Sequence, residues 1–368
     1  MNKRIHFIAG VGTMALCAGC SDVPEGRIEI TPPAADLAFD ETFVKDRDIH
    51  LNMPEGVVLG RIGHMVVDSK GNLIVSDPIQ NIVFQIDTEG HYLRQIGARG
   101  GAEGEYFNVL KILLAPNDDL YIHSVREGMK YLVFSGDSYK FKREAPDPNS
   151  AYVDHVILTE GGNIYASEVD SEYALSRLDD HFNKVDRMYP VKDTRTGQAL
   201  NRFHNTVLTP KRGGGFYFMY PTSYEIRQYS EQGELKQTLF SDYRSKHRDG
   251  IKPFPANLNP SDWNPKIEEW FAEHIVHGQL FEYGPDLLIL KQYRREVGGE
   301  WKYYLNILNK DGYSVADGIS VPARHTPLTV DGRGLYFRVE GAFDEATGET
   351  NDPYVSVYRL NDRVGEAR

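Results

Sequence analysis

Six turn-and-strand units at near-regular spacing predict an all-β fold, a six-bladed β-propeller. Each unit places a Gly, Asn or Asp turn before a short apolar strand, as in "SKGNLIVSD" and "EGGNIYASE". The first apolar residues of these strands are Leu73, Leu120, Ile164, Phe216, Leu287 and Leu335. The spacings between them are 47, 44, 52, 71 and 48 residues. One supersecondary unit that recurs at this period is typical of propeller blades.

The first unit shows what each blade contains. Strands are expected at 64–67, 72–76, 82–86 and 92–96, from "HMVV", "NLIVS", "IVFQI" and "YLRQI". Turns at 68–71 and 87–90 end in glycine, which tolerates the backbone angles of a tight turn. Four strands in this span make one blade. Apolar residues fill them because each blade is buried between two neighbours.

A ring of blades must also be closed. The segment "RDIHLNM" (Arg47–Met53) is predicted to be the fourth strand of the last blade, beside "PYVSVYRL". Such pairing removes the free strand edges. The long fourth interval is predicted to carry an insertion at about 241–276. Within it, "SDWNPKIEEWFAEHI" reads as a helix with Trp270 and Phe271 on one face, forming either a lid or loop padding.

The glycine-rich stretch "GARGGAEGEYFN" (97–108) is predicted to join blade one to blade two. A phosphate loop would need a helix directly after the glycines, and "FNVLKILLAP" reads as a strand instead. A role for Glu103, Glu105 or Tyr106 at the rim is the other alternative.

These segments resemble a known family. "HMVVDSKGNLIVSDPIQNIVFQIDTEGHYLRQIG" is similar to the NHL-like blade pattern. "GARGGAEGEYFN" resembles the G-R-x-G-x-G-P-G-E-[YF] segment of six-bladed propeller lipoproteins from polysaccharide-rich bacterial habitats, with Glu103 in place of the proline. The resemblance covers about residues 40–362 and implies the fold and export. It hardly implies a function, because propellers serve both enzymes and scaffolds.

The N-terminus predicts export and a lipid anchor. Residues 1–19 combine a basic start with a short apolar run, which suits a signal peptide and is too short to span a bilayer. "LCAGC" resembles a lipobox, so Cys20 is the expected lipidation site. A plain cleaved signal and an uncleaved segment are the alternatives. We expect a lipidated linker at 20–40, the propeller at 41–362 and a tail at 363–368, held at the bacterial cell envelope.

Composition narrows the partners. The chain has 368 residues and a formal net charge of −12, and an acidic surface repels nucleic acid. After cleavage before Cys20 no internal disulfide can form, so stability must come from the core alone. A monomer is expected, attached to the membrane only through its lipid.

Histidines recur just before the predicted inner strands. His64 and His155 each stand nine residues before their strand, and His277 and His325 ten. Inner strands begin at one mouth of a propeller's central channel, here called the top. These four histidines are therefore candidate ligands of a divalent metal such as zinc, with His64 and His155 also candidate acid–base groups. Ordinary hydrogen-bonded histidines are the alternative, since a shift of one residue turns a strand side chain to the other face.

The ends of the second strands should point to the same mouth. There Arg126, Tyr220 and Arg338 are candidate catalytic or binding residues, suited to an anionic ligand such as a uronic-acid glycan. Solvated loop side chains are the alternative reading. Two functions follow. The first is a propeller that binds a small molecule, glycan or protein partner on its top face. The second is a His-centred, metal-dependent lyase or hydrolase that acts on an anionic glycan at the channel mouth.

Overall fold

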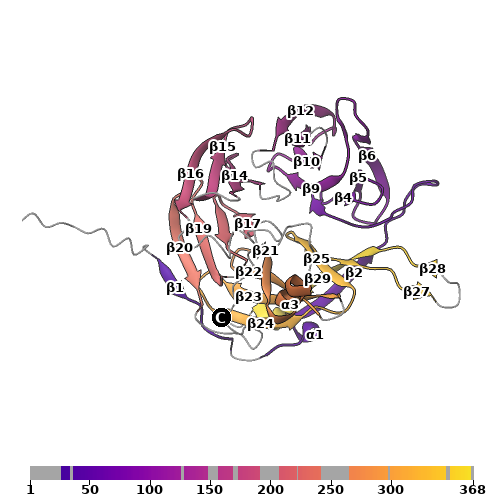
Figure 1. Cartoon of the computed structure of the whole chain (residues 1–368). Coiled ribbons are helices and arrows are strands. Elements are labelled where there is room, and N and C mark those ends of the chain that lie inside the picture. The colour runs from indigo at the N-terminus through magenta and orange to yellow at the C-terminus, as the bar shows by residue number, and fades with distance from the viewer. Residues whose placement is uncertain are drawn as a thin grey trace, which may run out of the picture.

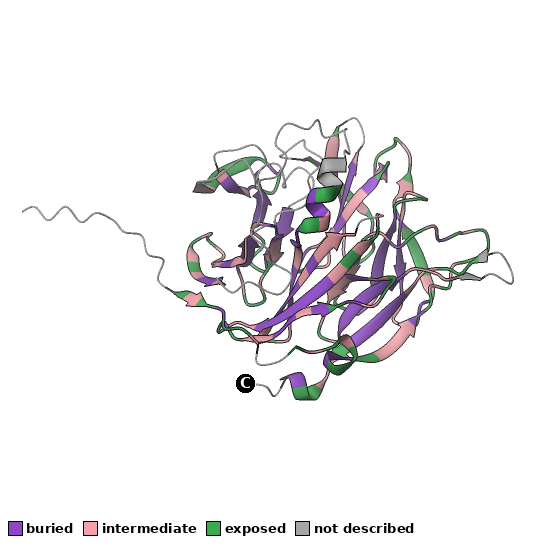
Figure 2. Ribbon diagram, turned by 60° about the horizontal axis from the view of Figure 1, so that its bottom comes forward, coloured by how far each residue is buried: buried purple, intermediate pink, exposed green. Residues whose placement is uncertain are grey.

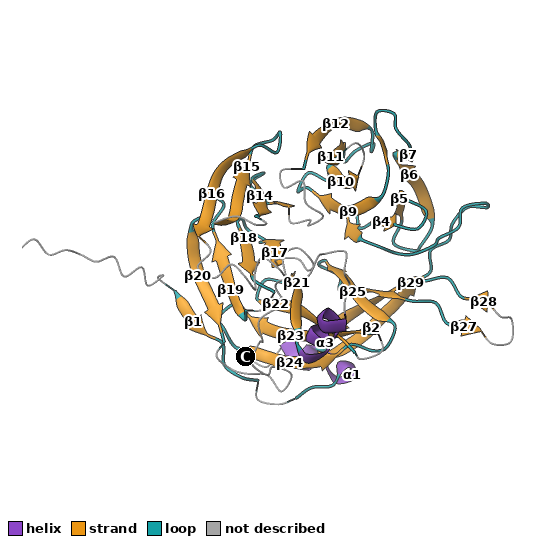
Figure 3. Ribbon diagram, in the orientation of Figure 1, coloured by secondary structure: helices purple, strands orange, loops and turns teal. Residues whose placement is uncertain are grey.

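The computed structural model is a ring of six blades (Figure 1). It describes residues 26–33, 36–125, 128–147, 156–168, 173–190, 207–221, 223–241, 265–296, 299–344 and 349–365. Each blade is an antiparallel sheet with its inner strand at the channel and its outer strand at the rim (Figure 3). The predicted fold class is confirmed.

The strands of the first three blades follow one another in sequence. Blade one is β3 (Met65–Val67), β4 (Leu73–Asp77), β5 (Ile82–Ile86) and β6 (Tyr92–Ile96). Blade two is β9 (Val109–Leu114), β10 (Leu120–Val125), β11 (Met129–Phe134) and β12 (Phe141–Pro146). Blade three is β13 (Val156–Leu158), β14 (Ile164–Ser167), β15 (Tyr173–Leu178) and β16 (Lys184–Pro190).

The other three blades complete the ring. Blade four is β17 (Val207–Pro210), β18 (Phe216–Met219), β19 (Glu225–Tyr229) and β20 (Leu235–Phe240), with β1 (Arg27–Glu29) at its outer edge. Blade five is β21 (Val276–Tyr283), β22 (Leu287–Arg295), β23 (Trp301–Asn309) and β24 (Ser314–Ser320). Blade six is β25 (His325–Val330), β26 (Leu335–Val339), β29 (Tyr354–Leu360) and β2 (Phe43–Ile49). Smaller elements are the helices α1 (Phe39–Thr42), α3 (Pro265–Glu273) and α4 (Asp362–Gly365), and the pairs β7 (Ala98–Arg99) with β8 (Glu105–Tyr106) and β27 (Phe343–Asp344) with β28 (Glu349–Thr350).

Six apolar clusters fill the six spaces between neighbouring blades. Alternation along each strand explains this, because successive side chains point to opposite faces. In β4, Leu73 and Val75 pack toward blade six, whereas Ile74 packs toward blade two. Buried residues accordingly run along the strands and exposed ones gather at the turns (Figure 2).

The closing strand is an N-terminal one, as predicted, but it lies about four residues earlier. β2 spans Phe43–Ile49 and pairs with β29, from Phe43 opposite Leu360 to Ile49 opposite Val355. The predicted residues 50–53 instead cross to blade one, where Asn52 forms a bridge with His91. Leu51 and Met53 pack on the cluster between blades six and one, so their strand-like alternation reflects that contact.

The glycine-rich stretch is a joint between β6 and β9, as predicted. Gly97 needs to be glycine because its φ is +65° and an added Cβ would lie 2.6 Å from the Tyr106 ring. Tyr106 is fully buried; its hydroxyl donates to the Ile96 carbonyl and accepts from the Val83 amide. The tyrosine therefore serves the joint rather than the rim.

Two segments predicted from the sequence have other bounds in the structure. The expected linker at 20–40 contains β1, which pairs in parallel with β20. The expected helix begins at Pro265 and ends at Glu273, while residues 242–264 of the insertion lie outside the described residues. So do the signal peptide, Cys20 and the tail after Gly365.

Candidate functional site

A central channel of about 1140 Å³ runs between the inner strands of all six blades. The starts of β3, β9, β13, β17, β21 and β25 mark its top mouth. His64 and Lys111 line it there. Lys211, Arg212, Glu160 and Glu282 line the opposite mouth, at or beyond the ends of inner strands. The channel is thus a single cavity whose two ends carry different side chains.

Lys291 is the most unusual side chain in this cavity. It sits on β22 of blade five, and its Nζ donates to the Pro327 carbonyl of blade six at 2.9 Å. The ammonium also lies 5.1 Å from the centre of the Tyr303 ring. In the part of the chain that the structure describes, no carboxylate forms an ion pair with Lys291. Among the described residues, the Pro327 carbonyl is the hydrogen-bond acceptor of this ammonium, which carries three N–H donors and lines the channel.

Arg338 is the second cation of the same wall. It lies on β26, is only 8% exposed and lines the channel. Its Nη1 donates to the Ile62 carbonyl at 2.7 Å and its Nη2 to Thr326 Oγ1 at 3.3 Å. Its Nε lies 2.8 Å from Glu340 Oε1. These contacts fix the guanidinium beside Lys291. We call the two residues the Lys291–Arg338 pair.

The electrostatics of this pair are those of an anion site. Burial, followed by the charge of Arg338, lowers the pKa of Lys291 to about 8. Burial also lowers the pKa of Arg338, although Glu340 opposes the shift. Arg338 is buried and Lys291 half-buried, and the carboxylate that contacts the pair among the described residues, Glu340, lies against Arg338, so local positive charge remains in a chain of net charge −12. A bound anion would offset both the free-energy cost of burying these charges and the repulsion between them.

Aromatic side chains flank the pair in the channel: Tyr293, Trp301 and Tyr303. Trp301 stands edge-on to Tyr293, with ring centres 5.5 Å apart, and to Phe271, 5.7 Å away. Phe271 belongs to α3, which packs on β22 and directly precedes β21. The helix therefore supports one wall of the channel from the top face (Figure 3).

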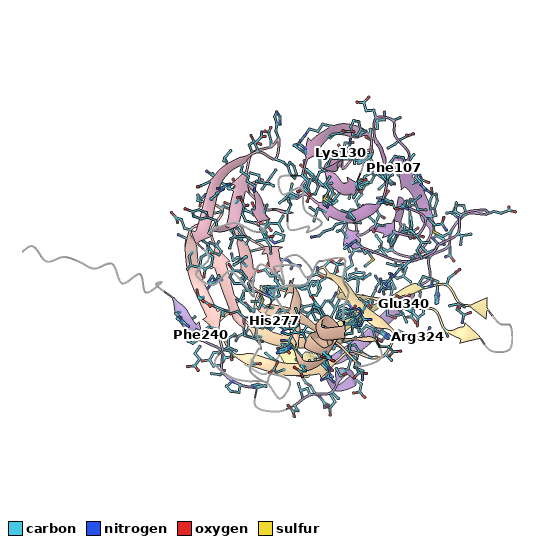
Figure 4. The ribbon with its side chains drawn as sticks, viewed as in Figure 1. Phe107, Lys130, Phe240, His277, Arg324 and Glu340 are labelled. Carbon is cyan, nitrogen blue, oxygen red and sulfur yellow. The ribbon has the colours of Figure 1, made fainter. Side chains whose placement is uncertain are left out.

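The predicted histidines occupy separate places. His64 lines the channel. His277 is fully buried, bonded to Gln292 at 3.0 Å and edge-on to Tyr224 of blade four (Figure 4). His325 bonds the Ala323 carbonyl at 3.0 Å and lies near Phe337 and Tyr358. His155 lies outside the described residues, within which no group of three or more His, Cys, Asp or Glu side chains is placed to hold a metal. The four-histidine metal site stays a prediction.

The other predicted site residues do not all lie in the channel. Arg338 lines the channel, whereas Arg126 lies outside the described residues. Tyr220 packs on Phe218 and Tyr189 between blades three and four, where burial raises the pKa of its hydroxyl. Lys291 was not predicted. Its signal is the run "LLILKQYRR", in which a lysine occupies the register of Ile289, a core position facing blade six.

Comparison with known proteins agrees with this architecture. Residues 27–259 match the DUF5128 family model, described as a 6-bladed β-propeller. The chain belongs to this family. The description of this family names only its architecture, so the match leaves the activity open.

Two solved structures share the fold. A "putative exported protein" from Bacteroides fragilis NCTC 9343 is 12% identical, with 91% of this chain and 99% of that chain covered and a TM-score of 0.64. A DUF4221 member from Bacteroides vulgatus is 9% identical, with 87% and 98% covered and a TM-score of 0.64. None of the curated proteins with which the chain was compared matches it. No helix among the described residues is long and apolar enough to cross a membrane.

Proposed function

We propose that this protein is an exported, lipid-anchored propeller that binds a carboxylated ligand at the top of its channel. The Lys291–Arg338 pair carries the proposal. An ammonium without a carboxylate partner in the described structure, fixed beside a buried guanidinium, is costly for the folded chain. A carboxylate would accept hydrogen bonds from both cations and offset that cost.

The walls around the pair suit a glycan. Tyr293, Trp301 and Tyr303 offer apolar ring faces beside the cations. The cavity of about 1140 Å³ exceeds the usual 300–1,000 Å³ of small-molecule sites. A short oligosaccharide that contains uronic acid would satisfy both features, with its carboxylate on the pair and its sugar rings against the aromatics.

The N-terminal sequence supports both export and anchoring, and the name of the exported Bacteroides fragilis protein with the same fold supports export alone. Incorporation of labelled fatty acid at Cys20, abolished by Cys20→Ser, would test the anchor. Label that persists in the variant would contradict it.

The binding test compares oligogalacturonate with its methyl-esterified, uncharged form by isothermal titration calorimetry. We expect binding of the acid only. Lys291→Met and Arg338→Met should each weaken it roughly tenfold or more, since a hydrogen bond to a charged group contributes about 1.5–3 kcal/mol. Lys211→Met is the matched control, because Lys211 lines the same channel at its opposite end.

Equal affinity for the acid and the ester, or equal loss in the Lys211→Met control, would contradict the proposal. The His-centred lyase stays a separate prediction. Among its described histidines only His64 lines the channel, so no observation favours it over binding.

A further inference from the structure

We propose that Lys291 is a nucleophile that forms a reversible imine with an anionic carbonyl compound, whose carboxylate is held by Arg338. The ligand class is a 2-oxo acid or an acid that bears an aldehyde, such as an oxidised or open-chain acidic sugar. The inference rests on the proposed function, because it uses the same anion site and assigns a reaction to one of its residues.

The placement of the amine is the first argument. Lys291 Nζ donates to the Pro327 carbonyl, its one hydrogen bond among the described residues, and Lys291 lines a cavity of about 1140 Å³. An acidic partner would keep the nitrogen protonated, and within the described residues none pairs with it. Nucleophilic lysines are activated by desolvation or by a neighbouring cation, and Lys291 has both.

The protonation state supports this geometry. Burial and the charge of Arg338 bring the pKa of Lys291 to about 8. At pH 7 roughly a tenth of the side chain is then the neutral amine, far more than for an ordinary lysine. The surface lysines Lys45 and Lys302 differ, because their hydrogen bonds to carboxylates raise the pKa above its ordinary value.

The two cations are linked through adjacent residues of β25. Arg338 Nη2 donates to Thr326 Oγ1, and Lys291 Nζ donates to the carbonyl of the next residue, Pro327. A ligand held by both needs two oxygen-bearing groups close together. A carboxylate next to a carbonyl, as in a 2-oxo acid, has that spacing. A neutral aldehyde lacks the group that Arg338 would bind.

The reaction balances without an oxidant or reductant. The lone pair of the neutral Lys291 nitrogen attacks the carbonyl carbon and forms a C–N bond, while the C=O π pair moves to oxygen. A proton passes from nitrogen to that oxygen and gives a carbinolamine. The hydroxyl then leaves as water, with a second proton, and a C=N bond forms. Hydrolysis reverses every step.

The experiment traps the imine in the intact mature protein. Glyoxylate is the probe, because it joins an aldehyde to a carboxylate, and sodium cyanoborohydride supplies the hydride that converts the imine into a stable carboxymethyl amine. Peptide mass spectrometry then gives the modification rate of each lysine. We expect Lys291 to be modified roughly tenfold faster or more than Lys211, which lines the same channel at its other mouth.

Three further reactions test the assignment. Lys291→Arg should remove the fast modification, and Arg338→Met should slow it, whereas Lys211→Arg should leave Lys291 modified at the normal rate. Acetaldehyde, which has no carboxylate, should prefer Lys291 over Lys211 less strongly than glyoxylate does, because only the lowered pKa of Lys291 then favours it. The comparison between Lys291 and Lys211 within the unaltered protein needs no variant, so a folding defect cannot hide the result.

The outcomes separate the two proposals. Modification of Lys291 at the rate of Lys211 in a protein that binds oligogalacturonate overturns the imine and keeps the anion site. Absence of both binding and fast modification overturns both. An equal preference for Lys291 over Lys211 with glyoxylate and with acetaldehyde shows a reactive amine without carboxylate recognition, and overturns the assignment of Arg338.

Discussion

The charge of Lys291 destabilises the folded protein at neutral pH. Since its pKa of about 8 is below the ordinary 10.5, the protonated form is disfavoured in the folded state. This penalty is fully present below pH 8 and disappears as pH rises from about 8 to 10.5. We therefore expect Lys291→Met to raise the free energy of unfolding by roughly 1–2 kcal/mol at pH 7, after allowance for solvent in the channel.

Urea denaturation at pH 7 and pH 10 would measure this gain. Its size should decrease at the higher pH, where the lysine of the original protein is largely neutral. A less stable variant at pH 7 would mean that Lys291 supports the fold, and the argument for a costly charge would fail.

Glu231 is a residue of the opposite kind. From the turn after β19 it accepts hydrogen bonds from Thr159, Gly161 and Asn163 of blade three and from the Gly215 amide. Burial raises the pKa of Glu231, but these hydrogen bonds lower it by more, so that the pKa is about 2. Its stabilisation is therefore complete above pH 4.5 and is lost as pH falls from about 4.5 to about 2.

Glu231→Gln should lower the free energy of unfolding by roughly 1–2 kcal/mol at pH 7, since half of the acceptor set is lost and the site is partly screened. Denaturation curves at pH 7 and pH 3 would show a smaller difference at pH 3. Glu234→Gln is the control: Glu234 is a surface residue paired with Lys236, and the change should be much smaller. A loss that is equal at both pH values would show that charge is not the cause.

The residues of the site show where sequence reasoning succeeds. Arg338 was predicted because it ends a second strand, and the ends of second strands share one mouth. Lys291 lies in the middle of β22. That its side chain lines the channel follows only from which residues of β22 face the channel in the structure. His277 shows the limit: a register shift between His277 and Gln279 accompanies its contact with Gln292 and Tyr224. Spacing along a sequence does not show such a shift.

At the scale of elements, α3 connects the insertion to the site. Phe271 is fully buried and contacts Trp301, which lines the channel. Phe271→Leu should cost about 1–2 kcal/mol of stability and weaken binding of oligogalacturonate several-fold, because Trp301 loses the ring that orients it. Thermal denaturation would measure the loss of stability, and titration calorimetry would measure the loss of affinity.

Phe182→Leu is the matched control for that helix. Phe182 is equally buried but packs between blades two and three, against Tyr131 and Tyr121. It should lose similar stability and keep full affinity. If both variants bind equally well, α3 is padding rather than a support of the binding wall.

Elements were predicted best where glycine turns bound them. The four strands of blade one are confirmed within a residue or two, because Asp68–Gly71 closes its turn by the Gly71 amide hydrogen bond to Asp68. The closing strand was displaced because, within residues 43–53, apolar and polar residues alternate only from Ile49 to Met53, past the end of β2. Pairing with β29 uses the first part and packing on blade one uses the rest. Tertiary contacts alone distinguish them.

The whole molecule is held as a ring by its N-terminal segment. Phe43 enters the cluster between blades five and six, and Ile49 the cluster between blades six and one. Upstream, β1 pairs with β20 of blade four, and Thr31 bridges to Tyr313 of blade five. This stretch thus contacts three consecutive blades: it pairs with the outer strand of blade four, bridges to blade five at one residue and supplies the outer strand of blade six.

Two truncations test what β1 and β2 each contribute to stability. A chain that begins at residue 36 loses β1 and Ile30, which is 3% exposed, and should unfold cooperatively with a free energy lower by roughly 2–3 kcal/mol. A chain that begins at residue 50 lacks β2, leaves the outer edge of β29 unpaired and removes the strand that closes the ring, so it should lose the cooperative transition in circular dichroism and aggregate. Adding a peptide of residues 36–49 should restore the transition, because the strand can pair from outside. A cooperative, soluble protein without β2 and without the peptide would show that blade-to-blade packing alone closes the propeller.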